Sequence, residues 1–208
     1  MGRWEPNTRE RLAKAALNLY GERGFEQTTV AEIAKSAGLT ERTFFRHYAD
    51  KREVLFSGAV ELEQLFAGAV ADAPPSSAPI DAMALGLYAV CEVFEERREF
   101  ARKRHAVISA TAELRERELI KLASLAAALA ETLRGRGVPE PAASLTAETG
   151  VAVFKVAFER WITADGTRPL VQLARDSLEE LRAVARGDLP VRPEEEAGPG
   201  VPEESAEA

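Results

Sequence analysis

Apolar residues recur with a helical period along most of this chain of 208 residues, whereas the alternating pattern that predicts strands is almost absent. The chain is therefore predicted to be all-α. Glycine and proline interrupt the pattern at 135–141 and at 165–169, where helices are expected to end. The helices predicted in the second half of the chain run over residues 81–98, 101–111, 113–135, 141–164 and 169–186.

An apolar segment ahead of these helices predicts a further helix from Asp50 to about Ala71. The sequence APPSSAP at 73–79 ends it, because proline cannot continue a helix and serine favours turns. The connecting segment 53–79 is predicted to link an N-terminal domain mechanically to a second domain that starts near Ile80. Its large apolar side chains are spaced to face both domains. They are Val54, Leu55, Leu62, Leu65 and Phe66.

Residues 28–52 have the pattern of two short helices joined by a tight turn. Thr29 can cap the first helix, and Glu32 three positions later can close a capping box. Gly38 can take the left-handed conformation that often ends a helix, and Thr40 can cap the second helix. This layout predicts a helix-turn-helix.

The second of these helices has an apolar face and several polar and basic side chains around it. Phe44 and Tyr48 are four positions apart and so share the apolar face. Arg42 can reach a guanine edge in the major groove, and Thr43 can bond a base or a phosphate. A merely solvated helix face is the alternative, but the capped helix and glycine turn before it favour DNA recognition. The basic side chains suited to phosphate contacts are Arg46, His47 and Lys51.

Residues 8–56 resemble the N-terminal DNA-binding domain of the TetR family of bacterial transcriptional regulators. The similarity runs from TRERLAKAALNLYGERGFEQTTV through AEIAKSAGLT to TFFRHYADKREVL. The resemblance implies an all-α homodimer with a three-helix helix-turn-helix domain, here residues 1–52, that binds a palindromic operator of double-stranded DNA. It also implies a helical effector-binding and dimerisation domain, here residues 80–186.

One position departs from the family pattern. The family often has a tyrosine at the position of Phe45, where the hydroxyl bonds a phosphate, so Phe45 is expected to make a packing contact only. The residues and the resemblance together predict a set of DNA contacts. It comprises Thr28, Thr29, Thr40, Arg42, Thr43, Phe45, Arg46, His47 and Lys51.

Charge is distributed unevenly along the chain, which carries a formal net charge of −7. Residues 1–52 hold ten Lys and Arg against seven Asp and Glu, a net of +3. Residues 187–208 hold one Arg against seven acids, a net of −6, and their richness in proline and acid predicts a disordered tail. A modestly basic end on an acidic body suits DNA binding through that end alone.

The last two predicted helices are candidates for the dimer interface, since two such helices of each subunit form a four-helix bundle in the resembled family. A palindromic operator requires a two-fold dimer. The alternative is that their apolar side chains fill the core of their own subunit. The residues in question are Val153, Val156, Ala157, Arg160, Trp161, Leu170, Leu173, Leu178 and Leu181.

A pocket for a small hydrophobic effector is expected in the second domain, although no short motif defines one. The basic cluster RKRH at 102–105 could bind a carboxylate or phosphate, or could simply be a solvated helix end. The C-terminal segment also resembles a subgroup in which acyl-CoA-like ligands are implied, while drug-like aromatic effectors fit the same residues. The candidate lining residues are Tyr88, Phe94, Arg104, His105, Phe154, Phe158 and Trp161.

These observations predict a ligand-responsive transcriptional regulator, a repressor that an effector releases from its operator. A DNA-binding dimer controlled by a protein partner, with no small effector, is the alternative. An enzyme is the competing class. Cys91 as nucleophile and His105 as general base are the one catalytic pair that could be proposed, and they lie on separate predicted helices.

Metal ions, cofactors and membranes are not expected as partners. With Cys91, His47 and His105 the chain offers no metal constellation. Charges break its apolar runs before the ~20 residues that cross a bilayer. Its N-terminal sequence MGRWEPNTRERL has no apolar signal core. A cytoplasmic location is therefore expected.

Overall fold

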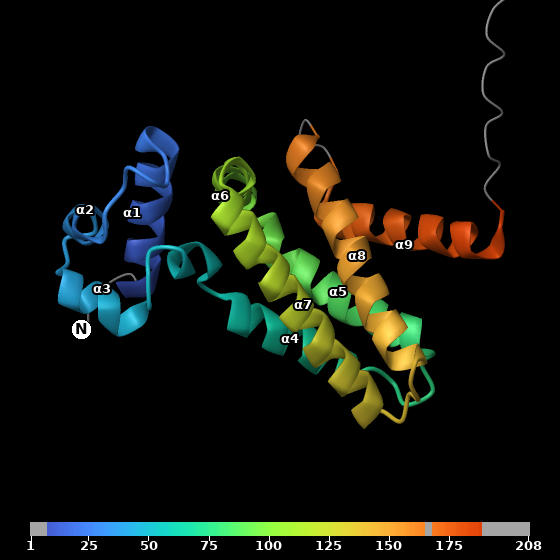
Figure 1. The fold of residues 1–208 in the computed structure, drawn as a ribbon. Helices are drawn as coiled ribbons and strands as arrows, with labels where there is room; N and C mark the ends of the chain where they lie inside the picture. Colours follow the sequence, from blue (N-terminus) through green and yellow to red (C-terminus); the bar gives the residue numbers. More distant parts are fainter. Residues whose placement is uncertain (1–7, 165–167, 189–208) are drawn as a thin grey trace, which may run out of the picture.

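The computed structural model describes residues 8–164 and 168–188, and within these ranges the chain is helical without a strand. The all-α prediction is confirmed. Figure 1 shows a small group of helices at one end of the molecule and a larger bundle at the other. The elements are α1 (Thr8–Arg23), α2 (Val30–Ser36), α3 (Glu41–His47), the 3-10 helix η1 (Glu53–Phe56), α4 (Ala59–Ala71), α5 (Pro79–Glu95), α6 (Arg98–Ala110), α7 (Ala112–Gly135), α8 (Ala142–Thr163) and α9 (Leu170–Arg186).

We call α1, α2, α3 and η1 the head, and α4 to α9 the body. The head packs around a core that includes Leu12 and Phe44, both fully buried. Two residues of the body, Ile108 of α6 and Leu114 of α7, complete that core. The head is therefore seated on the body through shared apolar packing, at the corner between α6 and α7.

The segment after α3 differs from the prediction of one helix from Asp50 to about Ala71. It forms the 3-10 helix η1, breaks at Ser57 and Gly58, and resumes as α4. Two local causes act. The Asp50 carboxylate accepts the Arg52 amide at 2.8 Å, which caps a tight turn, and Gly58 has a φ of 91°, a left-handed conformation that interrupts a helix.

The apolar side chains of this segment divide between the two cores. Val54 and Leu55 are buried in the head, and Phe66 is buried in the body, where Leu62 packs beside that core. Leu65 is 38% exposed, contrary to the expectation that it faces the head or the body.

Residues 53–71 also pass the length and hydropathy criteria for a membrane span, the one stretch of the described ranges that does so. The break at Gly58 leaves α4 with 13 residues. A helix of that length rises roughly 20 Å, short of the ~30 Å of a bilayer core. Its side chains Phe66 and Val70 are fully buried in the body, so we interpret α4 as a helix that packs on the body through one face.

The five helices expected from the second half of the chain are all present, with boundaries that agree within three residues. They form a bundle in which α5 lies against α4, α8 and α9. The contact between α4 and α5 is close because Gly86 has no side chain: a Cβ there would stand 2.6 Å from a ring carbon of Phe66. Most of the acidic tail predicted at 187–208 lies outside the described residues.

Candidate nucleic-acid interface

The turn between α2 and α3 has the caps that the sequence predicts. The Thr29 hydroxyl accepts the Glu32 amide at 3.2 Å, and the Glu32 carboxylate accepts the Thr29 amide at 2.9 Å. That backbone hydrogen bond, then the one from the threonine hydroxyl, lowers the pKa of Glu32. Gly38 has a φ of 66°, and the Thr40 hydroxyl accepts the Thr43 amide at 3.2 Å. Both caps and the glycine turn are confirmed.

Helix α3 is anchored by one face and free on the other. Phe44 is fully buried, and Tyr48 just after the helix is 4% exposed. The side chains of Arg42, Phe45 and Arg46 are exposed. Phe45 leaves 55% of its surface exposed, which is unusual for a phenylalanine, and its ring meets the Phe44 ring in a T-shaped contact. The arrangement presents two guanidinium groups and an aromatic ring on a rigid base.

Three other predicted DNA contacts are threonines, and they are exposed or half-buried. Thr29 and Thr40 are exposed and Thr43 is half-buried. The Thr40 and Thr43 hydroxyls lie 3.0 Å apart and share a hydrogen bond. Contacts of these side chains with DNA stay a prediction, compatible with where they lie.

Thr28 lies differently from its prediction as a DNA contact. Its side chain is buried, and its hydroxyl donates to the carbonyl of Gly24 at 2.9 Å. The hydroxyl therefore closes the end of α1 and is not available to a phosphate. We reassign Thr28 to the structure of the head.

Lys51 is also placed differently from a phosphate-binding lysine. Its ammonium group donates to the carbonyls of Phe25 at 2.8 Å and Thr28 at 3.1 Å, and lies 4.3 Å from the centre of the Phe25 ring. It thus satisfies carbonyls that follow α1. A long-range contact of this kind has no local sequence signal, and we reassign Lys51 as a residue that holds the head together.

His47 is half-buried at the end of α3. Its Nε2 is enclosed and has no hydrogen-bond partner among the described residues. The ring lines a hollow of about 150 Å³ between the head and the body, together with Ser57 and Lys121. A phosphate contact from His47 would have to come from Nδ1.

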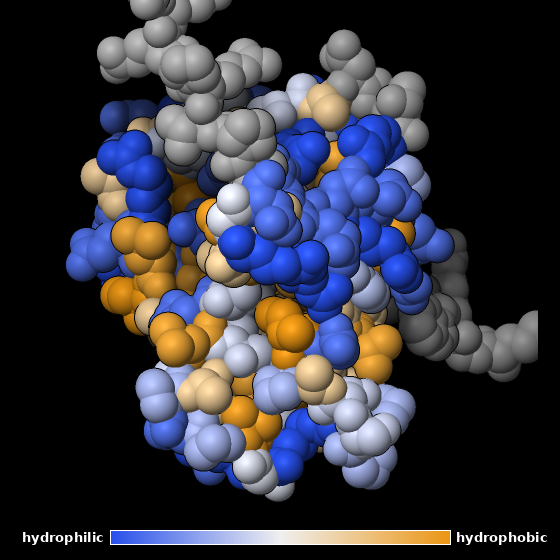
Figure 2. All heavy atoms as spheres, turned by 90° about the vertical axis from the view of Figure 1, so that its right-hand side faces the viewer, coloured by the Kyte–Doolittle hydropathy of each residue, from blue (hydrophilic) through white to orange (hydrophobic). Residues whose placement is uncertain are grey.

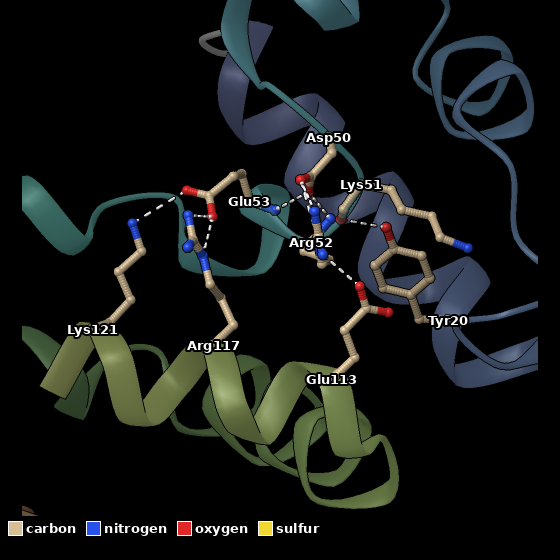
Figure 3. A network of polar contacts seen from close by, with 8 residues as sticks. All are labelled: Tyr20, Asp50, Lys51, Arg52, Glu53, Glu113, Arg117 and Lys121. Carbon is tan, nitrogen blue, oxygen red and sulfur yellow. Dashed lines mark hydrogen bonds and ion pairs between the residues drawn. The ribbon is translucent and has the colours of Figure 1, made fainter.

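Polar contacts that the sequence did not predict join η1 to α7 (Figure 3). Glu53 accepts hydrogen bonds from Arg117 at 2.6 Å and Lys121 at 3.2 Å. Arg52 donates to Asp50 and, at 2.5 Å, to Glu113 at the start of α7. The three pairs that reach α7 fix the head against the body, but their charges lie more than 60 positions apart along the chain, so no local sequence pattern predicts them.

Five of the seven predicted pocket residues come together where α5, α6 and α8 meet. The Phe94 ring lies 5.7 Å from Phe154 and 5.6 Å from Phe158. Trp161 lies 5.9 Å from Phe158, and His105 lies 6.1 Å from it. We call these five residues the aromatic cluster. Trp161 is buried, whereas the other four are half-buried and so reach the surface.

The remaining two predicted pocket residues do not belong to the aromatic cluster. Tyr88 lies under the guanidinium of Arg175, 4.2 Å from it, on the side of α9. Arg104 faces the head, where its Nε donates to the carbonyl of Leu55 at 2.6 Å. Adjacent residues of a helix point about 100° apart, so His105 and Arg104 cannot share one pocket wall.

Most of the predicted interface residues of α8 and α9 are buried in their own subunit, as the alternative interpretation held. They are Val153, Ala157, Trp161, Leu170, Leu173 and Leu178. Val156 is 50% exposed, and on the same stretch of α8 Leu145 is 64% exposed. Figure 2 shows the end of the molecule that carries α9, where apolar surface lies beside polar surface.

The described residues hold no group of three His, Cys, Asp or Glu side chains that could bind a metal. Cys91 is buried in α5, and burial raises the pKa of its thiol to about 12. A thiol that stays protonated at neutral pH is a poor nucleophile. His105 is bonded to Ser109 of its own helix, with 3.1 Å between Nε2 and the hydroxyl oxygen.

Comparison with known proteins agrees with this geometry. Residues 12–57 match the family model for bacterial regulatory proteins of the tetR family, and residues 77–186 match the model for the MftR C-terminal domain. A curated relative, the HTH-type transcriptional regulator TcmR of Streptomyces glaucescens, is 37% identical over 83 residues. That alignment covers 40% of this chain and 37% of the relative, well under two thirds of its length.

Two solved structures share the fold over nearly the whole chain. One is FadR of Thermus thermophilus, a TetR-family repressor in complex with lauroyl-CoA (22% identity, TM-score 0.55, 91% of this chain and 100% of that one). Another is the SmeT–triclosan complex (18% identity, TM-score 0.59, 94% and 100%); SmeT represses the Stenotrophomonas maltophilia multidrug efflux pump SmeDEF. Since the C-terminal model alone spans more than half of the sequence and the N-terminal model covers the helix-turn-helix, the chain belongs to the tetR family of bacterial transcriptional regulators.

Proposed function

We propose that this regulator is a cytoplasmic repressor that binds a palindromic operator as a homodimer and is released by a small hydrophobic effector. The observation that carries DNA binding is the free face of α3. Arg42, Phe45 and Arg46 are exposed there, while Phe44 and Tyr48 hold the helix on the head core. A recognition helix needs this combination of rigid seat and exposed basic face to enter a major groove.

The exposed residues of the interface suit two kinds of DNA contact. Arg42, at the start of α3, suits bidentate contact with a guanine edge, which specifies sequence. Arg46 and the hydroxyls of Thr29, Thr40 and Thr43 suit the phosphates that fix the position of the head. Phe45 suits an apolar contact, such as a thymine methyl group or a deoxyribose.

Dimerisation is proposed through α8 and α9. Leu145, Ala152 and Val156 are exposed on α8 at intervals of seven and four residues, which places them on one stripe. Val184 is 56% exposed on α9. Sedimentation velocity tests the assignment: Val156→Glu should produce monomers, whereas Val93→Glu, an exposed valine of α5, should leave the dimer intact.

The effector is proposed to bind at the aromatic cluster, because its half-buried rings are accessible and apolar. FadR of T. thermophilus is described in complex with lauroyl-CoA and SmeT in complex with triclosan. Both a long acyl chain and a drug-like aromatic compound suit such a surface. Quenching of Trp161 by lauroyl-CoA or by triclosan would distinguish the two classes, and binding of neither would direct the search to other apolar compounds.

Release from DNA is proposed to follow from a change in the separation of the two heads. Half-sites in successive major grooves lie roughly 34–36 Å apart, so a displacement of several ångströms prevents both heads from docking together. The effector must bind the displaced conformation more tightly to have this effect.

A catalytic role is not proposed, because the buried thiol of Cys91 has a raised pKa and His105 belongs to the aromatic cluster.

The function is tested by fluorescence polarisation, with salt titration, on the DNA that flanks the coding region of this protein. Scrambled DNA of equal length is the control. Saturable preference for the flanking DNA, at two protomers or a small multiple per site, supports the proposal. Equal binding to both sequences at every salt concentration speaks against an operator there.

A further inference from the structure

The His47 ring at the end of α3 has a nitrogen whose hydrogen-bonding capacity is unused. Its Nε2 is enclosed and has no partner among the described residues. An enclosed polar atom without a partner is costly, so such atoms in folded proteins bond an ordered water or a ligand. The hollow that the ring lines, about 150 Å³ in volume, has room for several waters or for one small ion. The chemistry of its other walls decides between these occupants.

The first turn of α4, from Gly58 to Glu61, forms a second wall of the hollow. The hydrogen-bond ladder of the helix begins with the Leu62 amide, which donates to the Gly58 carbonyl at 2.9 Å. The amides of the three residues before Leu62 therefore have no acceptor within the helix. Gly58, at the N-cap position, has no side chain that could cap them. These amides form the positive end of the helix dipole and suit an anion.

The charged side chains that line the hollow form two pairs. Arg9 pairs with Glu61 at 3.4 Å, and Lys121 pairs with Glu53 at 3.2 Å. The second oxygen of Glu53 accepts a hydrogen bond from Arg117 at 2.6 Å (Figure 3). An ammonium group has three donors, and the bond from Lys121 to Glu53 uses one of them. Each carboxylate is thus held by a cation, whereas the lysine and the amides of α4 retain donors.

We propose that this hollow, between α3, α4 and α7, binds a small free oxyanion of the size of phosphate or sulfate. Nε2 of His47 donates when it carries a hydrogen, as it does in one neutral tautomer and in the imidazolium ion. Lys121 donates from α7, the first amides of α4 donate from a third side, and Ser57 adds an exposed hydroxyl. The site is separate from the aromatic cluster and from the exposed face of α3, so it goes beyond the proposed function.

The two histidines of the chain supply a reporter and an internal control. His47 lines the hollow, whereas His105 belongs to the aromatic cluster. The untagged full-length protein, isotopically labelled in its histidine rings, is titrated with phosphate and separately with sulfate at fixed pH. Chloride is lowered in step, so that the ionic strength stays constant. Nuclear magnetic resonance records the ring signals, and His47→Gln identifies which set belongs to His47.

The ring signals of His47 should move along a saturable curve with either anion, whereas those of His105 should stay in place. Lys121→Met should weaken the affinity for phosphate by about tenfold, the loss expected for one charge-assisted hydrogen bond. Lys103→Met is the matched control, since Lys103 is an exposed lysine of α6, and it should leave the curve unchanged. Should Lys121→Met fail to fold by circular dichroism, Ser57→Ala should weaken the affinity in part.

No movement of the His47 signals at any phosphate concentration would overturn the inference and leave the hollow to water. Equal movement of both histidines, or an unchanged curve in Lys121→Met, would overturn it as well. A last arm separates a free ion from a phosphate of DNA. At constant ionic strength, saturating phosphate should not weaken binding of a duplex that the wild-type chain selects from random DNA. Competition between phosphate and duplex, with equally weak duplex binding by Lys121→Met, would assign the hollow to DNA and overturn the assignment to a free ion.

Discussion

The head and the body differ in how directly their sequences express their roles. In the head, capping residues, a glycine turn and an amphipathic seven-residue helix are all local features, and each has the conformation that its residues favour. In the body, the aromatic cluster is assembled from three helices and contains no motif. The DNA-binding surface of the head is built from one short segment, whereas the proposed effector site of the body is built from segments that are distant in the sequence.

The largest effect that would sharpen this comparison is expected from Phe44→Ala. Removing a fully buried phenylalanine costs about 3–5 kcal/mol, and the loss should fall on the head, whose core contains Phe44. In urea, far-UV circular dichroism should show an early transition of the head while Trp161 fluorescence, in a Trp4→Phe background, reports an unchanged body. Leu129→Ala, fully buried in the body core, should shift the Trp161 transition instead. Coincident transitions in both variants would show one core, not two.

Arg42→Ala should have the next largest effect. Loss of a bidentate guanine contact costs about 1–3 kcal/mol and relaxes sequence preference at one operator position. Fluorescence polarisation should therefore show weaker binding to operator and little change on scrambled DNA, and Arg102→Ala in the body should be neutral. An equal loss on both DNA sequences would remove the base-reading role of Arg42.

Lys51→Met tests whether the Lys51 ammonium group stabilises the head or contacts DNA. The substitution removes the Lys51 hydrogen bonds to the carbonyls of Phe25 and Thr28, and leaves the Phe25 carbonyl with the Thr28 amide alone. This loss should lower the free energy of unfolding by about 1–3 kcal/mol. The slope of operator affinity against salt should stay as in the wild type. Arg46→Ala, by contrast, should reduce that slope by about one unit with little loss of stability. A reduced slope for Lys51→Met would return Lys51 to the phosphate contacts.

A smaller effect is expected from deleting residues 189–208. The deletion removes six glutamates and one arginine, a net charge of −5, so binding to scrambled DNA at low salt should become slightly tighter because less negative charge repels the phosphates. Operator affinity and sedimentation as a dimer should be largely unchanged. Loss of the dimer would give the tail a structural role.

The smallest effect at neutral pH concerns Cys91 in the body. Burial raises the pKa of its thiol from the ordinary 9.0 to about 12. A group whose pKa is raised by folding contributes stability below its unfolded pKa and loses it as pH rises through the folded value, here between pH 9 and about 12. Native protein should therefore react slowly with a thiol reagent at pH 8 and rapidly in urea, and Cys91→Ala should flatten the alkaline loss of stability. Rapid labelling of the native protein would show that the thiol is accessible.

The features predicted correctly from the sequence are those that depend on neighbours within four positions. Thr29, Gly38 and Thr40 are of this kind. Lys51 and Arg104 have side chains of types that bind DNA or anions, but in the folded protein they donate to carbonyls of distant segments. Their partners lie up to 49 positions away, and periodicity carries no information on such pairings. Thr28 is an exception, because its partner, the carbonyl of Gly24, lies only four positions away.

The break at Gly58 has local causes, but the helical pattern of the sequence does not reveal them. Glycine inside an apolar helical pattern is compatible with a continuous helix at a modest cost, and the turn of residues 50–53 depends on the Asp50 carboxylate, which also pairs with Arg52. The aromatic cluster could be predicted in part, since Phe154, Phe158 and Trp161 share one stripe of α8. The approach of Phe94 and His105 from two other helices could not.

The central claim is that the heads of two protomers bind the two half-sites of a palindromic operator. Its most direct test is selection of bound duplexes from a random pool by the full-length protein at physiological salt. The account predicts enrichment of an inverted repeat whose half-sites are centred about one helical turn, or a multiple of it, apart, with the enrichment lost in Arg42→Ala. Recovery of unrelated sequences, or of single half-sites with no symmetry, would contradict it.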